Sequence, residues 1–152
     1  MNDVAEIERL KYRYLRALDT KDWDEFAATL TDDVTGDYGG RLNFSTRDEL
    51  VGFMRKSLGP GVITEHRVAH PEIEVSGDSA RGRWYLSDRV IVPAVEFMLV
   101  GAAFYTDQYR RTDGGWRICA TGYDRTYEAT IPTSSIAGFA LKVGPAINVD
   151  VS

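Results

Sequence analysis

Hydrophobic and polar residues recur with two different periods along this chain, and the period changes near residue 62. Before that point, apolar residues recur every three or four positions, which is the spacing of one helix face. The first such face predicts an amphipathic helix over about residues 3–19. The apolar face of this helix comprises Val4, Ile7, Leu10, Tyr14 and Leu18.

Two further helices are predicted before residue 62. Asp22 with Glu25 resembles a capping box that opens the second helix. Ser45 or Thr46 can cap the third helix, which Gly59-Pro60-Gly61 ends. The apolar face of the second helix is Trp23, Phe26, Ala27 and Leu30, and that of the third is Leu50, Phe53, Met54 and Leu58.

Strand patterns dominate the chain after residue 62, and two short strand patterns lie before it. Glycine-rich turns connect several of these strands. The predicted strands are residues 35–38, 41–44, 63–69, 71–75, 80–92, 97–112 and 116–127. Turns such as Gly39-Gly40 and Asp113-Gly114-Gly115 are typical of hairpins, so we expect an antiparallel sheet. Helices followed by strands indicate the α+β class, with three N-terminal helices packed on one face of the sheet. We expect one domain over residues 1–152.

The C-terminal segment, residues 131–152, has no regular period but is too apolar for a solvated tail. It carries Ile136, Phe139, Leu141 and Val143 among glycine, proline and serine. We therefore expect it to cover either a pocket or a subunit interface.

Composition narrows the classes of function. The net charge is −5 and basic residues do not cluster, which argues against nucleic acid as a partner. No stretch approaches the roughly 20 apolar residues of a membrane span, and the N-terminus lacks a signal core, so we expect no membrane partner and a cytoplasmic protein. Cys119 is the single cysteine, which leaves no cysteine pair for an intrachain disulfide.

The predicted strand over residues 80–92 carries one acid among apolar residues. Asp88 alternates in phase with Trp84 and Leu86, which places it on the inward face. An unpaired buried carboxylate is costly, so Asp88 must be paired, protonated or directed into a cavity. Asp88 is therefore either a site residue or a buried acid with a structural partner.

The remaining chemistry points to proton transfer. His66 and His70 are the two histidines, and histidine is the side chain best suited to move protons near neutral pH. No HExxH metal pair, nucleophile elbow or phosphate-binding glycine loop is present, so we expect neither a metal nor a cofactor. Tyr14 lies on the apolar stripe of the first helix, and Asp19 near its end could orient an imidazole.

Several segments together resemble the SnoaL-like branch of the nuclear-transport-factor-2-like (NTF2-like), or cystatin-like, superfamily. They are Lys11 to Asp19, Lys21 to Asp24, His66 with Pro71-Glu72-Ile73, Gly82 to Asp88, Gly101 to Asp107, and Thr121 to Glu128. Within that branch the sequence is most similar to the bile-acid 7α-dehydratases, with scytalone dehydratase more distant. The resemblance implies a cone-shaped curved sheet around an apolar pocket. It also implies a catalytic set consisting of Tyr14, Asp19, His66, Asp88 and Arg125.

The implied activity is a cofactor-independent dehydratase acting on a hydrophobic steroid-like, polycyclic or aromatic hydroxy-carbonyl compound. His66 would be the general base, with Asp19 or Asp88 orienting it. A ketosteroid-type isomerase and a polyketide cyclase remain alternatives, as does a non-catalytic binding module. We expect the substrate to contact Phe53, Met54, Trp84, Leu86, Phe104, Tyr105 and Tyr123. The resemblance also implies a homo-oligomer, with a trimer favoured over a dimer.

Overall fold

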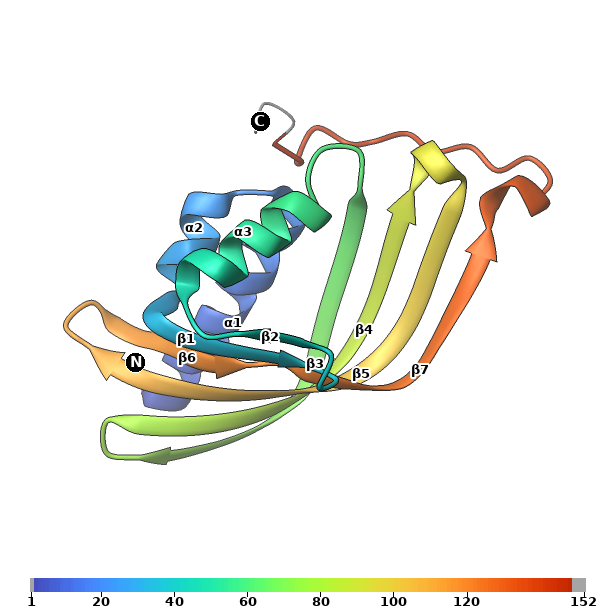
Figure 1. The fold of residues 1–152 in the computed structure, drawn as a ribbon. Coiled ribbons are helices and arrows are strands. Elements are labelled where there is room, and N and C mark those ends of the chain that lie inside the picture. The colour runs from blue at the N-terminus through green and yellow to red at the C-terminus, as the bar shows by residue number, and fades with distance from the viewer. Residues whose placement is uncertain (1, 149–152) are drawn as a thin grey trace.

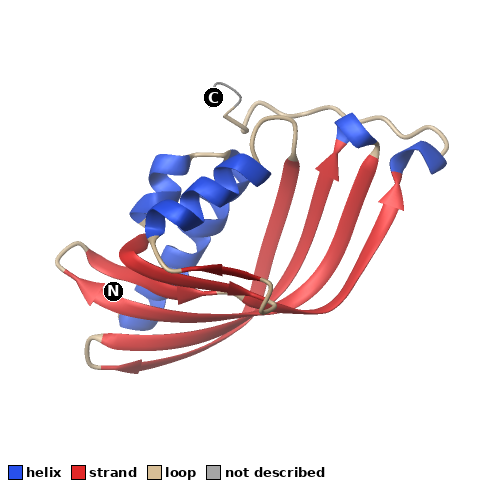
Figure 2. Ribbon diagram, viewed as in Figure 1, coloured by secondary structure: helices blue, strands red, loops and turns tan. Residues whose placement is uncertain are grey.

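The computed structural model describes residues 2–148 as three helices packed against one curved sheet (Figures 1 and 2). The helices are α1 (Asp3–Thr20), α2 (Trp23–Ala28) and α3 (Arg47–Ser57). The strands are β1 (Leu30–Tyr38), β2 (Leu42–Phe44), β3 (Ile63–Ser76), β4 (Ser79–Val92), β5 (Phe97–Thr112), β6 (Gly115–Thr121) and β7 (Tyr123–Pro132). The short 3₁₀ turns η1 (Pro93–Val95) and η2 (Thr133–Ser135) follow β4 and β7. The predicted α+β class is confirmed.

Side-chain caps begin the second and third helices where the sequence predicts them. Asp22 accepts a hydrogen bond from the backbone N–H of Glu25, and Thr46 accepts one from Glu49. The second helix is shorter than predicted, because α2 ends at Ala28 and Leu30 opens β1 instead. No helix in the described part of the chain is long and apolar enough to cross a membrane.

The sheet runs in the order β2-β1-β6-β5-β4-β3, and β7 pairs with the other half of β5. The expectation of a purely antiparallel sheet is wrong, because β1 runs parallel to β6 while the other pairs are antiparallel. Leu30 lies opposite Ile118, and the helical hairpin of α1 and α2 carries the chain to this position. The sheet is therefore mixed.

Two long strands differ from the sequence prediction. β3 continues through His70 and Pro71 as one strand, with an irregularity between Ala69 and Glu72 where His70 adopts φ +53°. The predicted strand over residues 116–127 is two strands, separated at Gly122. A side chain at Gly122 would overlap the carbonyl of Asp37, so the chain can cross β1 closely only with glycine there.

The helices cover the concave face of one half of the sheet, and β3, β4, β5 and β7 curve away from them (Figure 1). The core between helices and sheet contains Ile7, Phe26, Trp84 and Leu86, all fully buried. In the other half of the sheet, the ends of β3, β4, β5 and β7 lie away from the helices. The cavity described in the next section lies between this half and the half that the helices cover.

The C-terminal segment returns across the ends of these strands toward the helices (Figure 1), where the backbone N–H of Asn148 donates to the carbonyl of Thr20. Its apolar side chains remain exposed, including Phe139 and Val143, and no described residue of this segment lines the cavity identified below. Contact with a second copy therefore stays a prediction. Residues 149–152 of the predicted segment lie outside the described residues.

Candidate active site

Asp88 and His66 are direct partners across the β3–β4 pair, and both side chains point to the concave face. Asp88 is 6% exposed, so the sequence-based placement of an acid on the inward face is correct. The next residue in this row is Gly101 on β5, which lies opposite Glu128 on β7. The sheet register thus places an imidazole and two carboxylates in one row.

Asp19 fixes the imidazole of His66 from the end of α1. Its Oδ1 lies 2.7 Å from His66 Nδ1, and its Oδ2 accepts the backbone N–H of His66 at 2.8 Å. The Thr64 hydroxyl donates to Oδ1 at 2.8 Å. One carboxylate therefore bonds to both the backbone and the ring of His66.

The tautomer of His66 follows from these contacts. Because Asp19 is an acceptor at Nδ1, the neutral imidazole carries its proton on Nδ1 and a lone pair on Nε2. The imidazole ring of His66 makes no other hydrogen bond to a described residue, and its side chain is 8% exposed. The arrangement leaves Nε2 able to accept a proton. It also answers which acid orients His66, because Asp19 bonds to the ring and Asp88 does not.

Asp88 is held by Arg125 instead. The Arg125 guanidinium donates to both oxygens of Asp88, at 2.6 and 2.8 Å, and lies 3.6 Å from Glu128. These hydrogen bonds raise the pKa of Arg125 further above its usual value, so the guanidinium keeps its positive charge. A Cβ atom at Gly101 would overlap this guanidinium. Glycine at residue 101 therefore gives Arg125 the space to reach Asp88.

A cavity of about 260 Å³ opens between α1, α3 and the sheet at this row. Its polar lining includes His66, Asp88, Arg125 and three tyrosines. The apolar lining comprises Leu18, Leu42, Phe53, Met54, Leu58, Val90 and Leu99. An apolar chamber with a few converging polar groups is typical of a small-molecule site.

The three tyrosines that line the cavity are Tyr38, Tyr105 and Tyr123. Burial raises the pKa of each phenol, so each remains a neutral hydrogen-bond donor. Tyr14 lies behind them and its hydroxyl is 3.2 Å from that of Tyr38. Tyr14, a member of the catalytic set that the resemblance implies, therefore does not line the cavity and contacts it through Tyr38.

Four of the seven residues expected to contact substrate line the cavity: Phe53, Met54, Tyr105 and Tyr123. Trp84 and Leu86 do not, because they lie further along β4 in the core beneath α1. Phe104 faces the outer side of the sheet, where its ring packs against Tyr85. Alternation along β5 separates Phe104 from Tyr105, so only one of the two can face the chamber.

Sequence reasoning missed Tyr38 and Thr64 as site residues. Tyr38 shares a face of β1 with buried Val34, and that period-two pattern was available in the sequence. Thr64 shares a face of β3 with His66, which the strand pattern also contains. The contact of Thr64 with Asp19 depends on where α1 crosses β3, and no local pattern encodes that crossing.

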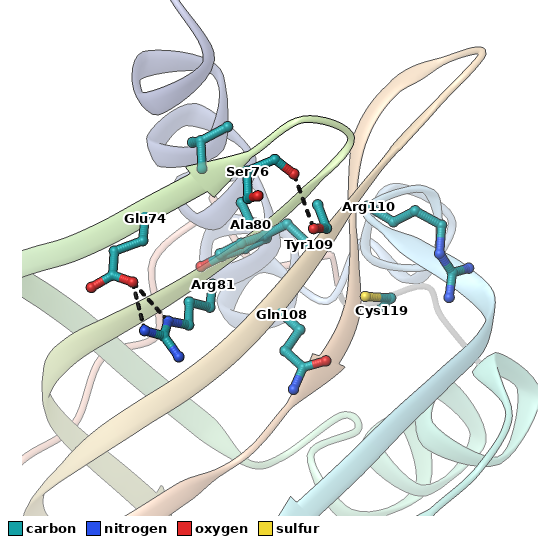
Figure 3. A pocket seen from close by; sticks show the side chains of 10 residues that line it. Glu74, Ser76, Ala80, Arg81, Gln108, Tyr109, Arg110 and Cys119 are labelled. Carbon is teal, nitrogen blue, oxygen red and sulfur yellow. Dashed lines mark hydrogen bonds and ion pairs between the residues drawn. The ribbon is translucent and has the colours of Figure 1, made fainter.

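A larger hollow of about 600 Å³ lies at the far end of the sheet (Figure 3). Its charged groups already have partners, since Arg81 donates two hydrogen bonds to Glu74. Partial burial raises the pKa of the Cys119 thiol, which makes it a poor nucleophile. Within residues 2–148 no three His, Cys, Asp or Glu side chains are grouped to hold a metal. The smaller cavity at His66 is therefore the candidate active site.

A SnoaL-like domain model matches residues 1–121 of the chain, which covers both Asp19 and His66. The chain belongs to the SnoaL-like domain family. Rv2910c of Mycobacterium tuberculosis is similar to this SnoaL-like protein, at 26% identity over 78% of the chain and 82% of its own length.

Solved structures confirm the cystatin-like fold of this SnoaL-like protein. A candidate scytalone dehydratase from Novosphingobium aromaticivorans superposes with a TM-score of 0.75 at 21% identity, covering 81% of this chain and 83% of that one. The hexachlorocyclohexane dehydrochlorinase LinA-type3 of Novosphingobium barchaimii superposes with a TM-score of 0.76 at 20% identity, covering 92% and 94%. At these identities the likeness concerns the fold. None of these matches bears on the expected closeness to bile-acid 7α-dehydratases.

Proposed function

We propose that this protein is a cofactor-independent lyase that removes water from a small, mostly apolar hydroxy-carbonyl compound. The observation that carries the proposal is the Asp19–His66 pair, because Asp19 bonds to Nδ1 of His66 and His66 lines a cavity with a largely apolar wall. A histidine held in one tautomer by a carboxylate is the usual arrangement of a general base. The names of the dehydratase and dehydrochlorinase neighbours are consistent with elimination chemistry.

The reaction would begin when His66 Nε2 removes a proton from the carbon next to the substrate carbonyl. The electron pair of that C–H bond forms an enolate, whose oxygen accepts hydrogen bonds from the cavity phenols. The enolate then collapses and expels the hydroxyl from the neighbouring carbon. That hydroxyl takes the proton back from His66 and leaves as water. The enzyme returns to its starting state, and the substrate has lost one molecule of water.

The size of the cavity restricts the substrate. Small-molecule pockets commonly measure about 300–1,000 Å³, and this chamber of about 260 Å³ lies below that range. It therefore favours a compound of one or two rings over a four-ring steroid. The charged Asp88–Arg125 pair at the wall can hold a polar group of the substrate away from the reacting carbon.

Product mass distinguishes this proposal from its rivals. One- and two-ring hydroxy-ketones and hydroxy-enones would be incubated with the protein and analysed by mass spectrometry. We expect loss of water from at least one compound and no loss with His66→Ala. An unchanged mass with a rearranged product would indicate an isomerase, and a new ring without loss of water would indicate a cyclase. No conversion of any compound would favour a binding module.

His70→Asn is the matched control for this screen. His70 is the second histidine, but its ring lies on the outer face of the sheet beside Tyr85. Asparagine tolerates the positive φ at residue 70 better than alanine does, so the strand should keep its shape. We expect this variant to retain the activity of the wild type.

A further inference from the structure

A buried ion pair that the proposed reaction leaves unused lies directly behind the cavity. Lys11 of α1 and Asp107 of β5 have side chains that are 0% exposed, and Lys11 Nζ lies 2.9 Å from Asp107 Oδ2. Buried pairs of this kind contribute little net stability compared with apolar residues of similar size. A cation retained at this position therefore calls for an explanation.

The ammonium of Lys11 is in contact with a cavity residue. Nζ lies 3.4 Å from the centroid of the Tyr105 ring and 4.6 Å from that of Tyr14. Tyr105 is 1% exposed and lines the cavity, and its hydroxyl makes no hydrogen bond to another described residue. The ring of Tyr105 thus has the ammonium of Lys11 against one face, and its hydroxyl group is available to donate a hydrogen bond to a ligand in the cavity.

The negative partner of Lys11, Asp107, also accepts hydrogen bonds from two hydroxyl groups. Asp107 accepts hydrogen bonds from the hydroxyls of Tyr109, at 2.8 Å, and Thr121, at 2.7 Å. Tyr109 in turn accepts from the indole N–H of Trp84 at 2.9 Å. These donors disperse the charge of the carboxylate, while the charge of the ammonium rests against the aromatic face of Tyr105. The ammonium thus contacts the ring of Tyr105 directly, while two hydroxyl groups donate to the carboxylate.

We infer that Tyr105 is the principal donor to a substrate oxyanion and that Lys11 is a positioning residue that strengthens this donor. A cation against the ring stabilises negative charge that shifts onto the phenolic oxygen as the hydroxyl donates. Burial raises the pKa of Tyr105, so it donates a hydrogen bond without losing its proton. The inference rests on the proposed function for its place in catalysis, but its chemistry can be measured without turnover.

The test uses 4-nitrophenolate as a probe of oxyanion binding and 4-nitrotoluene as its neutral counterpart. Both are single-ring compounds, and absorbance or calorimetry reports their binding. We expect the wild-type protein to bind the phenolate more tightly, and Tyr105→Phe to lose that preference. Lys11→Met combined with Asp107→Asn removes both charges while keeping similar volumes, which avoids an unpaired buried charge.

We expect K11M/D107N to weaken phenolate binding about 10-fold and nitrotoluene binding less than about twofold. In a Tyr105→Phe background the same pair of changes should have no further effect on phenolate binding. Arg111→Met is the control, because Arg111 also stacks on an aromatic ring, that of Trp116, but outside the cavity. It should leave both affinities unchanged.

Three results would overturn the inference. The first is a wild-type protein that shows no preference for the phenolate. The second is equal weakening of both ligands by K11M/D107N, which would indicate a structural role. The third is an effect of K11M/D107N that persists in the Tyr105→Phe background. Failure here with His66-dependent turnover intact would leave the lyase proposal standing, whereas phenolate binding without turnover would leave the inference standing.

Discussion

The carboxylate of Asp19 bonds to both the backbone amide and the ring Nδ1 of His66, so one side chain fixes the position and the direction of the imidazole. Asp19 ends a helix and His66 lies near the start of a strand, 47 residues later. The two elements are held together by this contact and by the hydroxyl of Thr64. Under the proposed function, Asp19 therefore acts on the substrate through His66.

Asp19→Asn should lower kcat by about 10²–10⁴-fold, because an amide no longer selects the Nδ1–H tautomer. Turnover of a substrate found in the screen is the measurement. Asp22→Asn is the matched control, since Asp22 caps α2 and asparagine caps a helix equally well. If Asp19→Asn retains turnover within about twofold of the wild type, Asp19 does not orient the base.

Arg125→Met should destabilise the fold by about 3 kcal/mol, because it leaves the carboxylate of Asp88 buried without a partner. Urea unfolding at neutral pH measures the loss. Adding Asp88→Asn to this variant should restore part of the stability, since it removes the unpaired charge. Equal stability of Arg125→Met and the wild type would show that Asp88 finds another partner.

Gly101→Ala should displace Arg125, because the new methyl group would occupy the position of the guanidinium and lie 3.0 Å from the Tyr127 carbonyl. We expect lower stability and weaker binding of polar substrates, measured by urea unfolding and calorimetry. Gly52→Ala is the control, since a methyl group there meets nothing within 4 Å on the surface of α3. That change should stabilise the protein by about 0.5–1 kcal/mol. Two variants of equal stability would argue against a tight fit at residue 101.

The helices and most strands follow from local pattern, and so does the inward placement of Asp88. Each of these patterns is local, since it depends on residues only a few positions apart. Examples are the helix caps at Asp22 and Thr46 and the alternation around Trp84. The parallel β1–β6 pair is different, because Leu30 meets Ile118 only through the packing of distant elements. The sequence around Gly122 likewise looks like an ordinary strand. The need for glycine there comes from the carbonyl of Asp37, which the tertiary fold places against it.

The site divides in the same way. His66 and Arg125 were predicted by residue type and by family resemblance, yet their partners depend on the tertiary fold. Tyr14 is an example: its helix face predicts burial, but the position of Tyr38 in front of it follows from the course of β1. Lys11 lies on the buried face of α1, where a lysine is unexpected, and that misplaced charge is a signal the sequence contains.

Stability should fall as the pH rises above about 10. Burial raises the pKa of Tyr14, Tyr38, Tyr105 and Tyr109 well above the usual value of about 10 for a tyrosine. Above pH 10 the unfolded chain loses these protons while the folded chain keeps them, so the folded state binds more protons and rising pH favours unfolding. The loss should reach up to about 5 kcal/mol per pH unit.

Burial also lowers the pKa of Lys11 and Lys21, so each lysine favours folding as the pH rises between its folded pKa and 10.5, but the buried tyrosines outnumber these two lysines. Guanidinium unfolding between pH 8 and about 11.5, with tyrosinate absorbance as a second probe, measures the balance. Stability that stays level through this range would contradict the burial of the four phenols.

In the proposed reaction, His66 is the general base at a largely apolar cavity. Wild-type protein and His66→Ala would be incubated with the panel of hydroxy-carbonyl compounds, and loss of water would be followed by mass spectrometry. We expect the wild type to form a dehydrated product and His66→Ala, folded as judged by circular dichroism, to form none above the uncatalysed rate. Dehydration by His66→Ala at the wild-type rate would show that His66 is not the base.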